Sequence, residues 1–217
     1  MLLTGCTGTT TRYSNVFDKS AEPSSAFRLL YLENKLSSTQ EQGNPQTNKL
    51  LASIGYNDLG YLLAERAPIV FNLNGLAIEV ETMQKNELGQ TAGQKMITWA
   101  KKNGKTAPVL VLQIVGGHSV TDTQRGYTII SLNLHANLYN PNTWQRIWTG
   151  QFENTLSIAM LGKIGFDNQF VDDLLKQILL QMSKDKLVVI PKGGVVMPSY
   201  AAKPKANASL HEVVSTN

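Results

Sequence analysis

Strict alternation of apolar and polar residues over 127–139 constrains the fold more than any other feature of this sequence. The apolar positions are Ile130, Leu132, Leu134, Ala136 and Leu138, with polar residues between them. A period of two is that of a β-strand with one face in the core and the other in solvent. An Asn-Pro-Asn turn at 140–142 and a second strand-like segment over 143–153 follow. The sequence therefore predicts a long antiparallel hairpin over 127–153.

The polar positions of the first strand of this hairpin are the candidate contact surface. Asn133, His135 and Asn137 lie on the side opposite the expected core. His135 could serve as a general base, but no carboxylate or nucleophile lies near it in the sequence to orient it or to use it. We therefore interpret these three residues as candidates for binding a partner, and we expect no catalytic residue.

Trp144, Trp148 and Phe152 are expected on one face of the return strand, where a place in the core is favoured over a binding platform. Gly116-Gly117-His118 is interpreted as a strand end or a bulge rather than a catalytic loop.

Two pairs of carboxylates could do acid–base or metal chemistry, but they are typical of solvated surface charge. Glu79 and Glu81 share one strand face, and Asp172 and Asp173 are adjacent on a helix. No catalytic signature occurs in the sequence. The single cysteine and three scattered histidines predict no metal site, and we expect no cofactor.

Apolar periodicity along the rest of the chain predicts an α/β (α+β) fold. Strands are expected over 28–33, 77–81, 109–115 and 187–190, and helices over 59–73, 91–103 and 168–182. Pro68 should kink or restart the first helix, Asn74-Gly75 should end it, and Asp167 should cap the last. We expect a mixed sheet of about five strands with helices packed mainly on one face.

Composition divides the chain into four parts. Residues 1–6 are interpreted as a residual signal peptide with a lipidation site, and residues 7–25, rich in Thr and Ser, as a flexible tether. Residues 26–190 should form a single domain, and residues 191–217 a disordered tail.

Charge and hydropathy argue against nucleic-acid binding and against a membrane-spanning helix. The net charge of +4 is spread over 217 residues, without the basic face and interleaved aromatics of a nucleic-acid binder. No run approaches the roughly 18 apolar residues of a membrane-spanning helix. We therefore expect neither nucleic-acid binding nor a transmembrane segment.

The sequence Leu3-Thr4-Gly5-Cys6 resembles the lipobox of bacterial lipoproteins at all four positions. The resemblance implies a lipid on Cys6, and Thr7, in place of Asp, implies sorting to the outer membrane with the domain facing the periplasm. Several acyl chains on one residue give stable anchoring. Only five residues precede Cys6, fewer than the basic segment and about 7–15 apolar residues of a signal peptide. A chain start further upstream and a chance match of the four positions both remain open.

The order of elements, the long hairpin and the Arg-Ile-Trp-Thr-Gly sequence at 146–150 resemble a group of periplasmic lipoprotein domains. The group includes penicillin-binding protein activators, the curli-secretion lipoprotein and auxiliary lipoproteins of ABC transporters, and it is related to the TolB N-terminal fold. This fold-level resemblance implies a non-enzymatic accessory protein that docks on an envelope protein. The alternative is a periplasmic carrier of a lipid or another apolar ligand, held between the helices and the sheet.

Overall fold

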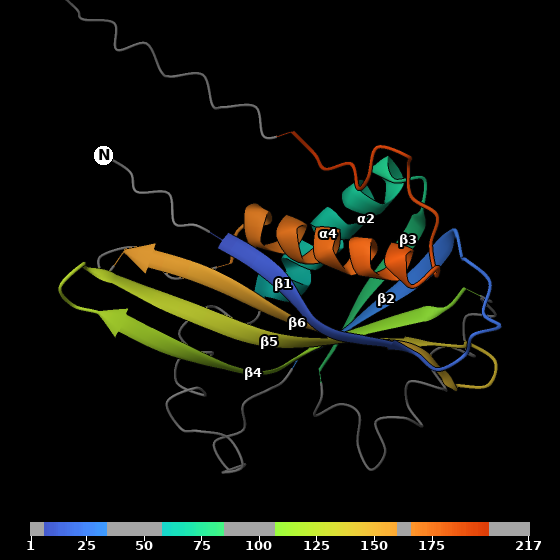
Figure 1. Ribbon diagram of the computed structural model, residues 1–217, viewed down its shortest axis with the longest axis horizontal. Helices are drawn as coiled ribbons and strands as arrows, with labels where there is room; N and C mark the ends of the chain where they lie inside the picture. The colour runs from blue at the N-terminus through green and yellow to red at the C-terminus, as the bar shows by residue number, and fades with distance from the viewer. Residues whose placement is uncertain (1–6, 34–57, 85–106, 160–165, 200–217) are drawn as a thin grey trace, which may run out of the picture.

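The computed structural model describes residues 7–33, 58–84, 107–159 and 166–199. These residues form an open six-stranded sheet with two helices on one of its faces (Figure 1). The mixed α+β fold predicted from the sequence is confirmed, with one strand more than expected.

The sheet combines a parallel and an antiparallel part. Its strands are β1 (Thr7–Val16), β2 (Ala26–Glu33), β3 (Ala77–Gln84), β4 (Val109–Asp122), β5 (Tyr127–Tyr139) and β6 (Arg146–Ala159). Their order in space is β1-β6-β5-β4-β2-β3. β2 runs parallel to both β3 and β4. The remaining pairs, β4 with β5, β5 with β6 and β6 with β1, are antiparallel. The predicted hairpin is β5 and β6.

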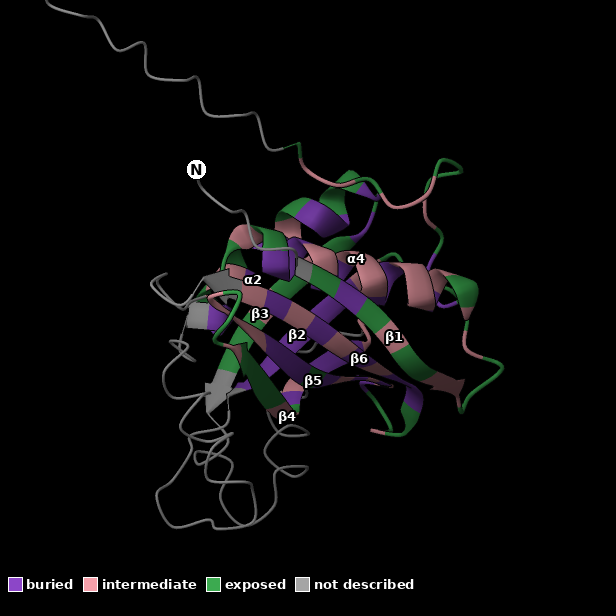
Figure 2. Ribbon diagram, turned by 60° about the vertical axis from the view of Figure 1, so that its left-hand side comes forward, coloured by how far each residue is buried: buried purple, intermediate pink, exposed green. Residues whose placement is uncertain are grey.

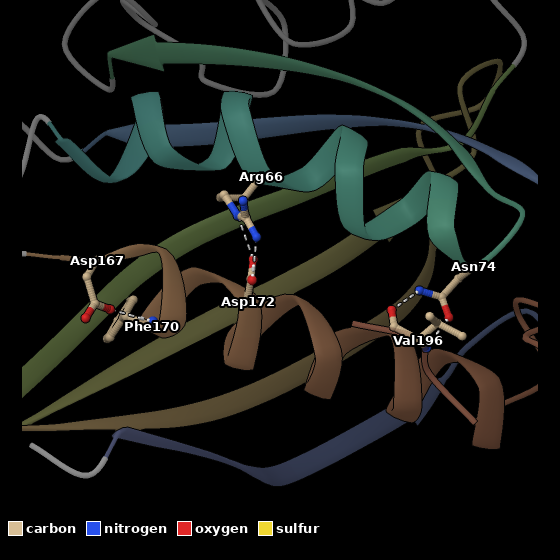
Figure 3. Close-up of polar contacts among 6 residues, drawn as sticks. All are labelled: Arg66, Asn74, Asp167, Phe170, Asp172 and Val196. Atoms are coloured by element: carbon tan, nitrogen blue, oxygen red, sulfur yellow. Dashed lines mark hydrogen bonds and ion pairs between the residues drawn. The ribbon is translucent and has the colours of Figure 1, made fainter. Parts of the chain in front are cut away.

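The helices are α2 (Asp58–Leu73) and α4 (Asn168–Lys184). The Asp167 carboxylate accepts a hydrogen bond from the Phe170 N–H at 2.8 Å, which is the expected cap of α4 (Figure 3). Pro68 does not restart α2, which runs on for five residues beyond it. Gly75, at φ 75°, follows its end as predicted. Neither helix is long and apolar enough to cross a bilayer.

The main core lies between the helices and the inner face of the sheet, and Figure 2 shows the buried residues gathered there. The apolar face of α4 is fully buried, as its periodicity predicts: Phe170, Val171, Leu174, Leu175, Ile178, Leu179 and Met182. Trp148 and Phe152 of β6 pack into the same core, with ring centroids 6.4 Å apart. Gly150 lies between them, where a Cβ atom would come within 2.8 Å of both rings.

The predicted flexible tether over 7–25 is wrong for residues 7–16, which form the edge strand β1. β1 pairs with β6 from Thr7 to Val16, with a bulge between Thr11 and Tyr13. Two inward side chains hold it in place: Asn154 Nδ2 donates to Thr9 Oγ1 at 2.7 Å, and Gln181 Nε2 donates to Ser14 Oγ at 2.8 Å. Threonine is β-branched and favours extended backbone, so a polar, Thr-rich segment suits an edge strand.

The C-terminal expectations are also corrected in part. Residues 187–190 form no strand, although Leu187 and Val188 are buried. Residues 191–199, predicted to be part of a disordered tail, are tied to the residue after α2 through Val196 and contact the main core through Val195 and Met197. The Asn74 side chain accepts from the Val196 N–H at 2.8 Å and donates to the Val196 carbonyl at 2.9 Å (Figure 3). This side-chain bridge fixes a segment whose composition alone indicates no order.

Several predictions lie outside the described residues. They are the helix over 91–103, the tail from residue 200 onward, and the four lipobox positions Leu3, Thr4, Gly5 and Cys6.

Candidate functional site

The candidate site is a set of polar side chains on the outer face of the sheet, opposite the helices. The three residues chosen from the sequence lie there: Asn133, His135 and Asn137 of β5. Strand β6 adds Thr149, Gln151 and Glu153 directly beside them. We call these six residues the polar face. Among the described residues, neither helix packs against it.

The register of β5 against β6 arranges the six residues of the polar face in three cross-strand pairs. Asn133 lies opposite Glu153, His135 opposite Gln151, and Asn137 opposite Thr149. Side chains opposite each other in an antiparallel pair have Cβ atoms about 4.5–5.5 Å apart. The two side chains of the third pair are hydrogen-bonded to each other, because Thr149 Oγ1 donates to Asn137 Oδ1 at 2.7 Å.

His135 is the titratable group at the centre of the polar face. Partial burial lowers the pKa of its imidazole below the usual value of 6.5. At neutral pH the ring is therefore uncharged, with one nitrogen that donates and one that accepts. No side-chain hydrogen bond to His135 is present in the described part of the chain, and the same holds for Asn133 and Gln151. Its cross-strand neighbours, Gln151 on β6 and Gln113 on β4, both carry amides, so neither described strand places a charged side chain directly opposite the imidazole.

Glu153 carries the one carboxylate of the polar face, and Arg12 of β1 neutralises it. The Arg12 guanidinium donates to Glu153 Oε2 across the β1–β6 pair. The polar face is thus rich in hydrogen-bonding groups and low in net charge. The alternation of apolar and polar residues in β6 could have placed Thr149, Gln151 and Glu153 on the polar face. Arg12 could not be placed there from the sequence, because residues 7–16 were not predicted to form a strand.

The two carboxylate pairs noted in the sequence differ in burial. Glu79 and Glu81 lie exposed on β3, as expected of surface charge. Asp172 is only 3% exposed, so its interpretation as solvated charge is wrong. Its oxygens accept from Arg66 Nε at 3.0 Å and Arg66 Nη2 at 2.7 Å, which joins α4 to α2 (Figure 3). Among the described residues, no group of three His, Cys, Asp or Glu side chains is placed to hold a metal ion.

The glycine pair before His118 marks a bulge rather than a strand end. The register of β4 against β5 shifts between Ile114 and Gly116, and β4 then continues to Asp122. His118 therefore lies exposed on a strand, with Ser131 opposite.

Trp144 departs from the expected common face with Trp148 and Phe152. It lies in the β5–β6 turn with φ 58°, a left-handed conformation that turns its side chain to the outer side of the sheet. There its ring packs 5.7 Å from Tyr139, beside a second buried cluster: Leu30, Leu32, Val109 and Val111. Burial raises the pKa of Tyr139, and the positive charge of Arg146 opposes this shift.

A hollow of about 410 Å³ lies at the same end of the sheet. It is lined by Phe17, Asp18, Asn140, Gln145, Arg146 and Ile147. The Arg146 guanidinium lies 4.4 Å from the centre of the Phe17 ring. Hydrogen bonds from the Ser20 hydroxyl and N–H lower the pKa of Asp18. Opposite charges and amides in its lining make this hollow a poor site for an apolar ligand.

No protein-family model matches the sequence, and no curated protein matches it. Solved structures show distant likenesses. PelC from Paraburkholderia phytofirmans, solved as a dodecamer, has a TM-score of 0.42 at 9% identity, over 85% of this chain and 99% of that chain. Lipoprotein GNA1162 from Neisseria meningitidis has a TM-score of 0.32 at 10% identity, over 75% and 99%.

A neuraminyllactose-binding hemagglutinin homologue from Helicobacter pylori has a TM-score of 0.32 at 11% identity, over 79% and 90% of the two chains.

Proposed function

We propose that this chain is a non-catalytic accessory protein of the bacterial cell envelope, anchored by a lipid on Cys6 and docking on an envelope protein through its polar face. One observation carries the docking role. Asn133, His135 and Gln151 lie side by side on the sheet face opposite the helices, and none of the three makes a side-chain hydrogen bond in the described part of the chain. A protein surface with matching donors and acceptors would satisfy them, as in the polar parts of ordinary protein interfaces.

The packing of the helices on the sheet supports docking over the alternative, a carrier of an apolar ligand. Leu63 and Val70 of α2 and Leu175 of α4 join the inner face of the sheet in one buried cluster. A carrier would be expected to keep an apolar cavity there. The hollow at the β5–β6 turn lies elsewhere, and its lining includes the charged groups of Asp18 and Arg146 and the amides of Asn140 and Gln145.

The anchor rests on the match of Leu3, Thr4, Gly5 and Cys6 to the lipobox. Thr7, in place of Asp, favours the outer membrane, with the domain facing the periplasm. Expressed in cells from its own gene, the protein should take up radioactive palmitate and fractionate with the outer membrane. Cys6→Ala should abolish the labelling, because it removes the thiol that takes the lipid. Labelling that persists in the variant would end the lipoprotein proposal.

The docking role is tested by crosslinking inside cells. A photoreactive amino acid at Asn133 should trap one defined envelope protein, whereas the same group at the exposed Asn72 on α2 should not. His135→Glu should remove that crosslink, because it adds a negative charge to a face that is otherwise nearly neutral. Crosslinks to lipid alone, or none, would contradict docking through the polar face. So would a protein crosslink that His135→Glu leaves unchanged.

A further inference from the structure

We infer that the β4–β5 end of the sheet lies against the lipid bilayer beside Cys6, with the hairpin tip in the headgroup layer; this inference rests on the lipid anchor proposed above. It concerns a surface distinct from the polar face, and its ligand is the bilayer interface itself.

The first argument is the absence of a tether between the anchor and the sheet. β1 begins at Thr7, the residue directly after Cys6. Consecutive Cα atoms are about 3.8 Å apart, so acyl chains on Cys6 are attached almost at the sheet. The start of β1 is held by pairing with β6 and by the hydrogen bond from Asn154 to Thr9. The domain therefore cannot move away from the membrane on a flexible linker.

The second argument is that neighbouring strands reach past the start of β1. Thr7 lies level with Leu156 of β6, Ile130 of β5 and Ser119 of β4. Each of these strands continues for three more residues beyond that level. This adds about 10 Å at a rise of roughly 3.3 Å per residue. Figure 1 shows these strand ends extending past the start of β1 and past the helices. A lipid on Cys6 thus places them at headgroup depth.

The third argument is the chemistry of the projecting end. Val120 is 59% exposed and lies opposite Ile129, so the two form an apolar pair on the outer side of the hairpin. Tyr127 lies opposite Asp122 at the next outward position, and Arg125 is exposed in the turn. Aliphatic, tyrosine and arginine side chains together are typical of segments that lie at the membrane interface. Figure 2 shows the free end of β4 exposed.

The hairpin tip is also ordered enough to act as a fixed contact. The Asp122 carboxylate accepts hydrogen bonds from the Gln124 and Arg125 N–H groups, both at 3.0 Å. Gly126 closes the turn with φ 70° and donates its N–H to the Asp122 carbonyl at 2.9 Å.

The test uses the lipidated protein, purified from cells and reconstituted into vesicles of phosphatidylethanolamine and phosphatidylglycerol. A fluorophore is attached at Thr123→Cys in the hairpin tip or at Asn142→Cys in the β5–β6 turn. These turns lie at opposite ends of β5, about 40 Å apart by strand rise. Lipids spin-labelled on the headgroup should quench the probe at position 123 at least twofold and leave the probe at position 142 unchanged.

Val120→Asp should reduce the quenching at position 123, whereas Val189→Asp should not. Val189 is also exposed, but it follows the C-terminal end of α4, away from the hairpin. Palmitate on Cys6 is measured in the same preparation. Equal quenching of both probes, or none at position 123 in palmitoylated protein, would overturn the orientation and leave the anchor intact. Absence of palmitate would overturn the anchor and this inference together.

Discussion

The ion pair between Arg66 and Asp172 joins the two described helices inside the protein. Both side chains are at most 10% exposed, and the guanidinium meets both carboxylate oxygens. A planar, two-point contact of this kind fixes the rotation of α4 against α2. Hydrophobic packing alone would leave that rotation less defined, since Leu side chains accept many arrangements.

Removing one partner of this pair should be strongly destabilising. Asp172→Ala leaves the Arg66 charge buried without its carboxylate, and it should lower the free energy of unfolding by about 3–5 kcal/mol. Urea denaturation followed by circular dichroism measures the change. Lys176→Ala, one turn along the same helix, is the matched control and should change stability by less than about 0.5 kcal/mol. Similar losses in the two variants would argue against the ion pair as the cause.

Gly150 is a second residue whose role depends on close contact. Gly150→Ala would place a Cβ atom 2.5 Å from Trp148 and 2.8 Å from Phe152, so rings in a packed core would have to move. Overpacking of this kind costs about 1–3 kcal/mol. Gly8→Ala is the control, because a Cβ at Gly8 meets nothing within 4 Å. Thermal denaturation of both variants tests the difference; a Gly150→Ala protein as stable as the Gly8→Ala protein would contradict it.

At the scale of elements, β1 changes how the domain relates to its N-terminus. As an edge strand it covers β6, and its Arg12 side chain completes the charge balance of the polar face. A tether would have left β6 as an open edge, which is prone to pairing with other chains. The strand therefore covers the edge of β6 and directly follows Cys6, the proposed lipidation site.

Hydrogen exchange distinguishes a strand from a tether. Amides of β1 that bond to β6 should exchange far more slowly than the seconds expected of an unstructured chain. Asn154→Ala should speed exchange in β1 more than in β5, because it removes the hydrogen bonds to Thr9 and to the Phe170 carbonyl. Thr155→Ala, on the opposite face of β6, should not. Fast exchange throughout β1 in the unaltered protein would contradict its pairing.

At the scale of the whole molecule, the proposed anchor and docking surface constrain each other. The polar face begins at the level of Thr10, opposite Glu153, and extends away from Cys6 along β5 and β6. With the β4–β5 end on the bilayer, it would face sideways, about 10–25 Å from the anchor by strand rise. The proposed partner would then be a protein whose domain stands next to the membrane.

The sequence alone determined the features that depend on local periodicity and capping. The alternation over 127–139 predicted β5 and its outward residues, and Asp167 predicted the start of α4. These predictions succeed because a period of two or a side-chain cap leaves its signature within a few neighbouring residues.

The tertiary structure decided what depends on partners far apart in the chain. Thr9 is a strand residue because Asn154 lies beside it, and Asp172 is buried because Arg66 neutralises it. Asn74 holds the backbone of Val196, which lies 122 positions further along the sequence. Polar segments give no periodic apolar signal, and the free energy that orders them comes from hydrogen bonds formed only once distant elements have packed together.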